Sequence, residues 1–164
     1  MQVALTHEPP HAGAAIFQRI LDAPGGLIAL EGGDSEALIA QFRNIARLSG
    51  QAVYLWQHEI GLGNLREAHA RVPGCQRLGA ALRYMQQSMH FGVYLLEGMQ
   101  LPLSAMDGNL LRQLARLPSG HVRRVVLLDA PAALVEQLGD SVLRFSGRLD
   151  LPQRPRLRDG RWLT

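Results

Sequence analysis

The sequence predicts an α/β protein with a mostly parallel sheet of about five strands and helices on both faces. Three observations support this fold class. Short runs such as 27–30 and 93–96 are continuously apolar, which is typical of strands buried on both faces. Segments with apolar residues at helical spacing alternate with these runs, the order that builds parallel strand–helix–strand units. Hydrophobic residues make up 47% and charged residues 19% of the chain, a composition typical of a folded domain.

The first half of the chain begins with a loose lead-in over residues 1–10, which ends in Pro9 and Pro10. Apolar periodicity and Gly or Pro breaks then predict a helix over 11–22, a strand over 27–30, a helix from an N-cap at Asp34 or Ser35 to about Gly50, and a strand over 52–56. The stretch 58–79 is the least regular and is expected to hold one short helix around 64–71.

The second half continues the alternation. We expect a helix around Leu82, Met85 and Met89 that ends near Gly92, a strand over 93–96, a helix from Asp107 or Asn109 to 117, a strand over 122–128, a helix over 132–138, and a fifth strand over 142–145. The predicted domain is 11–146. Residues 147–164 are predicted to be an Arg-rich extended segment on or beside it, with a possible antiparallel hairpin at Asp159-Gly160.

Candidate ligand-binding residues follow from this fold class, because open parallel sheets bind ligands beyond the carboxyl ends of their strands. The strand ends are therefore the places to inspect. They supply the candidate crevice residues Gly32, Gly33, Ser35, His58, Glu97 and Asp129.

The order of these strand ends resembles a known family. A Gly-containing turn follows the first strand, a later apolar strand ends in Glu97, and the next ends in Asp129. Over about residues 20–150 this resembles the RecA-like branch of P-loop NTPases, and most of all the inactive RecA-like domains found ahead of the ATPase module in some AAA proteins or in bacterial secretion regulators. The resemblance implies a three-layer RecA-like fold. In that family the first turn wraps phosphates and a strand-end acid holds magnesium.

The phosphate-binding chemistry of that family is missing here. All 17 basic residues other than His are Arg, whereas a P-loop needs G-x-x-x-x-G-K-[ST] with its lysine on the terminal phosphates. The corresponding stretch 31–36 is too short, and its carboxylates Glu31, Asp34 and Glu36 would repel a triphosphate. P-loop ATPase activity is therefore excluded, and Glu97 is expected to cap a strand or to bond neighbouring backbone. The stretch 61–66 has only two of the three glycines of a dinucleotide fingerprint and is interpreted as a loop.

Other catalytic chemistry is weakly indicated. His58-Glu59 is the best acid/base candidate, although a solvated loop pair is the favoured interpretation. Ser35 stands where a nucleophile elbow would place a serine, but G-x-S-x-G is missing and a helix cap is favoured. The six histidines lack metal-ligand spacing, and Cys75 is the only cysteine. We expect no catalytic residue, metal or cofactor.

The C-terminal segment carries the excess positive charge of a chain whose formal net charge is +3. Two interpretations remain open: a site for an anionic partner such as nucleic acid, with an aromatic ring to stack on bases, or a solvated edge hairpin, which we favour. The candidate residues for the anionic partner are Arg154, Arg156, Arg158, Arg161 and Trp162.

The leading functional hypothesis is a non-catalytic interaction or regulatory module that binds another protein or itself. The alternative is a regulatory domain that binds a nucleotide or another anionic ligand without hydrolysis. An enzyme in which His58, Glu59, Glu97 and Asp129 converge comes third. No apolar run approaches the length of a membrane span, and the N-terminus lacks a basic region followed by an apolar stretch. We therefore expect a cytoplasmic protein with no membrane partner.

Overall fold

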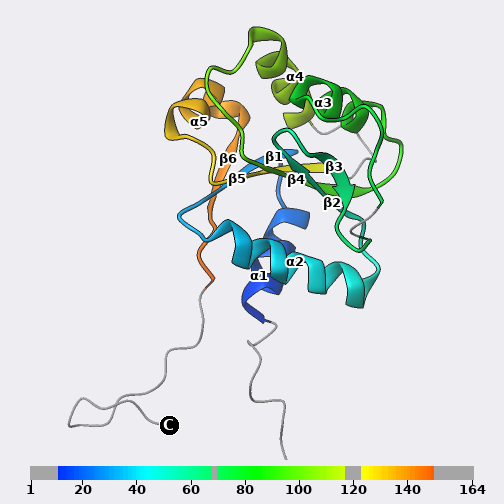
Figure 1. Ribbon diagram of the computed structural model, residues 1–164. Coiled ribbons are helices and arrows are strands. Elements are labelled where there is room, and N and C mark those ends of the chain that lie inside the picture. The colour runs from blue at the N-terminus through cyan, green and yellow to red at the C-terminus, as the bar shows by residue number, and fades with distance from the viewer. Residues whose placement is uncertain (1–10, 68–69, 117–122, 150–164) are drawn as a thin grey trace, which may run out of the picture.

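The computed structural model describes residues 11–67, 70–116 and 123–149. These residues form three layers, with a twisted sheet between two layers of helices (Figure 1). The helices are α1 (His11–Leu21), α2 (Ser35–Ser49), α3 (Leu78–Gln87), α4 (Ala105–Ala115) and α5 (Ala132–Leu138), followed by the 3-10 turn η2 (Gly139–Ser141). The strands are β1 (Leu27–Glu31), β2 (Val53–Gln57), β3 (Gly61–Asn64), β4 (Gly92–Glu97), β5 (Arg123–Leu128) and β6 (Leu143–Ser146).

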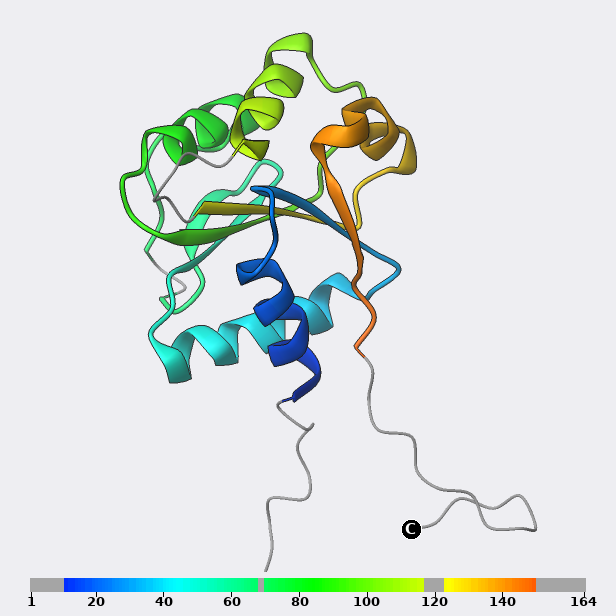
Figure 2. The same cartoon turned by 180° about the vertical axis from the view of Figure 1, so that it is seen from behind.

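The sheet has six strands in the order β3-β2-β4-β5-β1-β6. All neighbours are parallel except β3, which runs antiparallel to β2. Helices α1 and α2 cover one face, and α3, α4 and α5 cover the other (Figure 2). The predicted fold class is confirmed, with one strand more than the five expected.

The core consists of two apolar clusters, one on each face of the sheet. Strand β1 shows how they form, because successive side chains of a strand point to opposite faces. Leu27 and Ala29 belong to the cluster under α3, α4 and α5, whereas Ile28 and Leu30 belong to the cluster under α1 and α2. The apolar runs that predicted the strands are therefore runs of residues buried on both sides.

Helix α2 has the predicted ends. The Asp34 side chain caps it by accepting a hydrogen bond from the Glu36 amide (3.0 Å), and Gly50 ends it in the left-handed conformation at φ 74°. The predicted start of α4 was wrong. The helix begins at Ala105, because the Ser104 hydroxyl accepts from the Asp107 amide (3.0 Å) and acts as the N-cap. The helix predicted around Leu82, Met85 and Met89 is α3, and it ends earlier than expected, at Gln87.

The stretch 58–79 differs most from expectation. Residues 61–64 form strand β3 and not a loop, and the short helix predicted around 64–71 is not present in the described residues. The segment 70–72 instead pairs with the outer edge of β3, with the Val72 amide donating to the Leu62 carbonyl (2.8 Å). Two glycines lower the strand propensity of Gly61–Asn64, so the pattern was missed although Leu62 is fully buried.

Two adjacent arginines at the start of β5 hold helix ends on opposite faces of the sheet. Arg124 is buried and donates to the carbonyls of Ile20 and Leu21 at the end of α1 (3.0 and 2.8 Å). Arg123 donates to the carbonyls of Met85 and Gln86 at the end of α3. The carbonyls of Ile20 and Met85 also accept from the amides of Ala23 and Ser88, and the two guanidinium groups connect these helix ends, one on each face, to the sheet.

The carboxyl ends of β1, β2, β4 and β5 lie along one edge of the sheet, on the left of Figure 1. From this edge β1 leads to α2 on one face, whereas its neighbour β5 leads to α5 on the other. The topological switch point therefore lies between β1 and β5. None of the described helices is long and apolar enough to cross a bilayer.

Candidate functional site

The structure places the predicted crevice residues along this carboxyl edge. Gly32 and Gly33 follow β1, Ser35 begins α2, His58 follows β2, Glu97 ends β4, and Asp129 follows β5. The Glu97 carboxylate accepts a hydrogen bond from the side chain of Gln57, its neighbour on β2 (2.8 Å), and not from neighbouring backbone, which was one of the two expectations. Asp129 is exposed and has a left-handed backbone at φ 49°.

The turn after β1 is covered by residues 147–148, which follow β6. The Gly147 amide donates to the Glu31 carbonyl (2.7 Å). A β-carbon placed on Gly33 would lie 2.1 Å from the Gly147 carbonyl oxygen, and one on Gly32 would lie 3.3 Å from the Arg148 guanidinium nitrogen Nε. Residues 147–148 therefore occupy the space next to this turn.

The carboxylates around this turn have structural partners. Glu31 accepts from Nε and Nη2 of Arg144 on β6, at 2.7 to 3.1 Å. The hydrogen bond to Arg144 lowers the pKa of Glu31 below its usual range, and burial only partly opposes this effect. Asp34 caps α2, as described above. The sequence predicted that these groups repel phosphate; the structure shows in addition that they hold the turn and β6 in place.

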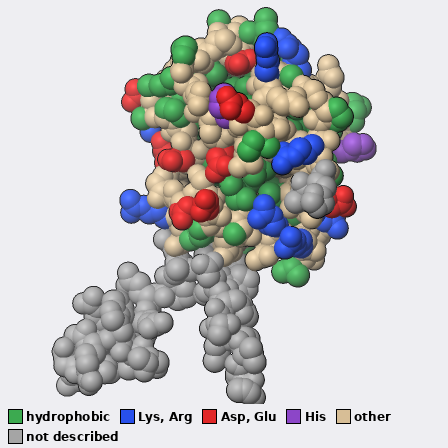
Figure 3. Space-filling view, viewed as in Figure 1, with side chains coloured by type: hydrophobic (Ala, Val, Ile, Leu, Met, Phe, Trp, Pro, Cys, Tyr) green, Lys and Arg blue, Asp and Glu red, His purple; other side chains and the backbone are tan. Residues whose placement is uncertain are grey.

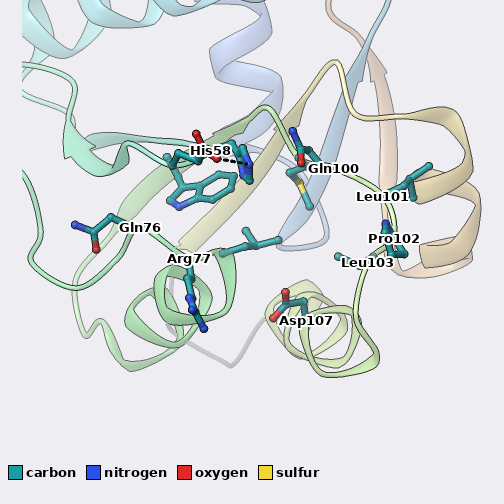
Figure 4. Close-up of a pocket in the computed structure, with 12 residues that line it drawn as sticks. His58, Gln76, Arg77, Gln100, Leu101, Pro102, Leu103 and Asp107 are labelled. Carbon is teal, nitrogen blue, oxygen red and sulfur yellow. Dashed lines mark ion pairs between the residues drawn. The ribbon is translucent and has the colours of Figure 1, made fainter.

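A pocket with a volume of about 580 Å³ lies farther along the same edge, between the ends of β2 and β4 and the starts of α3 and α4 (Figure 4). Of the predicted crevice residues only His58 lines it. The described lining residues are Trp56, His58, Glu59, Gln76, Arg77, Leu78, Met99, Gln100, Leu101, Pro102, Leu103 and Asp107. They come from four separate segments, so no local motif could have identified them from the sequence.

The pocket has an apolar floor and a polar rim. Trp56, Met99 and Leu103 are buried, and the Trp56 indole nitrogen already donates to the Cys75 carbonyl (3.0 Å). In Figure 4, His58 and Gln100 lie on the side of the strands, and Asp107 lies on the side of α3 and α4. The floor therefore offers a ligand mainly apolar contact.

The lining does not form a recognisable catalytic constellation. His58 and Glu59 contact each other at 3.6 Å, with 42% and 84% of their side chains exposed, as in the solvated pair that we favoured. The described lining residues include no serine, threonine, cysteine or lysine that could act as a nucleophile. The nearby Cys75 is buried, and burial raises the pKa of its thiol, which makes it less reactive.

In the described part of the chain, no three His, Cys, Asp or Glu side chains lie close enough together to hold a metal ion. The proposed anion-binding residues Arg154, Arg156, Arg158, Arg161 and Trp162 lie outside the described residues, as do the lead-in over 1–10 and the possible C-terminal hairpin. Their predicted roles stay predictions.

Charge is unevenly distributed over the surface. Acidic side chains predominate on the left of Figure 3, toward the carboxyl ends of the strands, and basic ones on the right, toward their amino ends. At the turn after β1 this side also carries Arg144, which pairs with Glu31, and the Arg148 guanidinium next to Gly32.

In a comparison with protein families, the model of the SpoVK-like AAA ATPase N-terminal domain matches residues 14–146. The matched range extends from α1 to β6 and so includes the whole sheet. Comparisons with curated proteins and with solved structures gave no match.

Proposed function

Since the chain belongs to the family of SpoVK-like AAA ATPase N-terminal domains, we propose that it is a non-catalytic regulatory domain that binds a protein. In this proposal the domain derives from a RecA-like NTPase, has lost the phosphate-binding lysine, and works by contact with another protein or with a second copy of itself. An N-terminal position next to an ATPase module fits such a role, because a domain there can present partners to the module or control it.

The closed turn after β1 is the observation that carries this proposal. Gly147 packs against Gly33 where a phosphate would lie, and Arg144 on β6 neutralises Glu31. With no lysine in the sequence, this turn has neither the space nor the charge to hold a triphosphate. The parallel sheet with helices on both faces is retained, so the scaffold of an NTPase remains without its central site.

The pocket at the ends of β2 and β4 supports the binding half of the proposal. It is concave, has an apolar floor and is rimmed by Leu101, of which 48% is exposed. Pockets with apolar floors and a few polar groups are the usual ligand sites of folded domains. An exposed large apolar side chain at the rim favours a partner that extends beyond the pocket.

Affinity capture with the full chain tests the protein-binding role. We would immobilise the wild-type protein, the Leu101→Asp variant at the pocket and the Tyr84→Asp variant outside it, and compare the proteins they retain from cells of the source organism. Tyr84 is a partly exposed residue of α3 that does not line the pocket. We expect at least one protein that wild type and Tyr84→Asp retain and Leu101→Asp loses, with equal melting temperatures as the check on folding.

A titration with MgATP tests the non-catalytic role and the alternative of nucleotide binding without hydrolysis. Calorimetry should show no saturable heat, and no phosphate should be released. Saturable binding of MgATP that is lost on changing the turn after β1 would overturn the proposal in favour of a nucleotide-binding domain. Retention of the same proteins by all three variants would refute the pocket as the contact site.

A further inference from the structure

We propose that the domain assembles head to tail with a second copy of itself, the amino end of strands β2 and β4 in one copy docking on the pocket at their carboxyl end in the next. This inference rests on the proposed function and names one partner for it. Two features at the two ends of this strand pair carry it: exposed apolar side chains and opposite charge.

The exposed apolar side chains of the described residues are concentrated at these two ends. Of the six large hydrophobic residues that are exposed, five lie there: Leu48 and Met89 at the amino end, and Ile60, Leu101 and Met106 at the carboxyl end. The sixth, Tyr84, lies on α3 and is the least exposed. Single exposed hydrophobics are common, but their gathering at two opposite ends of one strand pair favours an interface.

The amino end offers the protruding group. Leu48 is 86% exposed in the last turn of α2, which leads into β2, and Met89 is 76% exposed just before β4. Strands β2 and β4 are hydrogen-bonded neighbours that begin in register, with Val53 opposite Val93. Leu48 comes from the helical layer of α2 and Met89 follows α3 in the opposite layer, so the two side chains flank the starts of these adjacent strands from the two faces of the sheet.

The carboxyl end offers the receiving surface. The buried residues Trp56, Met99 and Leu103 form the floor of its pocket, and the exposed Leu101 lies at its rim. Ile60 follows the lining residue Glu59, and Met106 precedes the lining residue Asp107. A pocket with an apolar floor at one end thus corresponds to exposed apolar side chains at the other.

Charge complements this difference in shape. Glu59, Glu97 and Asp107 lie around the carboxyl end, where Arg77 is the opposing cation among the lining residues. Exposed Arg47 precedes Leu48 at the amino end, and exposed Arg66 follows β3, which ends beside the start of β2. Opposite charge on the two ends favours the head-to-tail orientation and disfavours contact between like ends, and in Figure 3 acidic side chains are the more frequent toward the carboxyl ends of the strands and basic ones toward their amino ends.

The geometry makes the contact heterologous. The two ends face opposite directions, so a copy that receives a neighbour at its pocket still presents a free Leu48 to another. Such contacts build rings when the rotation between copies closes and open chains when it does not. The expected assembly therefore grows beyond a dimer as the protein concentration rises.

Sedimentation velocity with the full chain, from micromolar to near-millimolar concentration, tests this inference. Wild type should show a mass that increases with concentration and decreases at high salt, because the charged contacts are screened. Leu48→Asp and Leu101→Asp should each stay monomeric, whereas Tyr84→Asp should behave as wild type does. Equal melting temperatures would show that the variants are folded.

Mixing the two monomeric variants provides the decisive result. Leu101→Asp keeps an intact amino end and Leu48→Asp keeps an intact pocket, so their mixture should form a one-to-one dimer that grows no further. A charge-reversed pair adds a second check: Arg47→Glu and Glu59→Arg should each weaken association by about tenfold, and the double variant should recover part of it.

Two outcomes would overturn the inference. One is a wild-type protein that remains monomeric at the highest concentration. The other is a mixture of the two variants that forms no dimer, which would point to a two-fold contact or to another surface. If a monomeric chain still captures a protein that depends on Leu101, the pocket binds a different partner: the self-assembly is then wrong and the proposed function stands.

Discussion

Replacing Arg124 by methionine is expected to destabilise the domain strongly, because one buried guanidinium group connects β5 to the end of α1. Arg124 is 5% exposed and donates to four carbonyl oxygens, those of Ile20, Leu21, Ala23 and Arg123, at 2.8 to 3.2 Å. Methionine fills much of the same space with apolar atoms and leaves these carbonyls without their charged donor.

The expected loss in the free energy of unfolding follows from two opposing effects. A hydrogen bond to a charged group contributes about 1.5–3 kcal/mol, and a buried carbonyl left without a partner costs about 1–3 kcal/mol, although such values do not add fully. Part of this loss in stability is offset, because the variant no longer has to bury a charged guanidinium group. The cost of that burial is visible in the lowered pKa of Arg124, of which burial is the main cause. We expect a net loss of about 3 kcal/mol, and a melting temperature lower by about 6–12 °C for a domain of this size.

Urea unfolding at neutral pH, followed by far-UV circular dichroism, measures this change in the free energy of unfolding. Arg124→Lys should lose less stability than Arg124→Met, because its ammonium group keeps the positive charge. It should still be less stable than wild type, because an ammonium lacks the planar fork with which the guanidinium reaches several carbonyls at once. Arg116→Met is the matched control: Arg116 is an exposed arginine at the C-cap of α4, and its loss should change stability by less than about 0.5 kcal/mol.

A result in which Arg124→Met lies within about 1 kcal/mol of wild type would refute this reasoning. It would mean that the carbonyls at the end of α1 find water or other partners, and that α1 is held by its apolar contacts alone. Equal losses for Arg124→Met and Arg116→Met would contradict it as well, because the argument depends on burial and not on charge.

Three further predictions concern the closed turn and the single thiol. Gly33→Ala should cost about 1–3 kcal/mol in urea unfolding, because the new methyl group meets the Gly147 carbonyl oxygen at 2.1 Å and the backbone must move. Arg144 lowers the folded-state pKa of Glu31, so the stability from this pair is present above the unfolded pKa of about 4.3 and lost as pH falls through the lower folded value. The difference between wild type and Glu31→Gln should therefore disappear in acid, and at neutral pH it should stay below about 1 kcal/mol because the pair is exposed. Cys75 should react with a thiol reagent only as fast as the domain opens, because it is buried and its pKa is raised; rapid labelling in native buffer would contradict this.

The parts of the fold that the sequence predicted well are those whose pattern is local. Strands β1, β4 and β5 are continuous apolar runs, and α2 carries an N-cap at Asp34 and a left-handed glycine at Gly50. Such signals act over a few residues and depend little on the rest of the chain. Strand β3 was missed because Gly61 and Gly63 weaken its local signal, and its pairing with β2 and with residues 70–72 supplies what the sequence pattern lacks.

The candidate site was only partly predictable for a related reason. Element order placed His58, Glu97 and Asp129 on one edge of the sheet, since all parallel strands end there. The pocket itself also needs Gln76, Arg77 and residues 99–103, which lie far from His58 in the sequence. Nothing local marks these residues, because their common property is a shared cavity that exists only once α3 and α4 pack beside β2 and β4.

The sequence alone therefore determined that the chain forms a helix-covered, mostly parallel sheet and that it has no lysine for a phosphate-binding loop, since both follow from residue type and short-range periodicity. The tertiary structure decided what the strand ends became. It placed Gly147 against Gly33, paired Arg144 with Glu31, buried Arg124 under the end of α1 and formed the pocket beside His58. These are contacts between segments distant in the sequence, and they depend on how helices and strands pack, which local sequence does not specify.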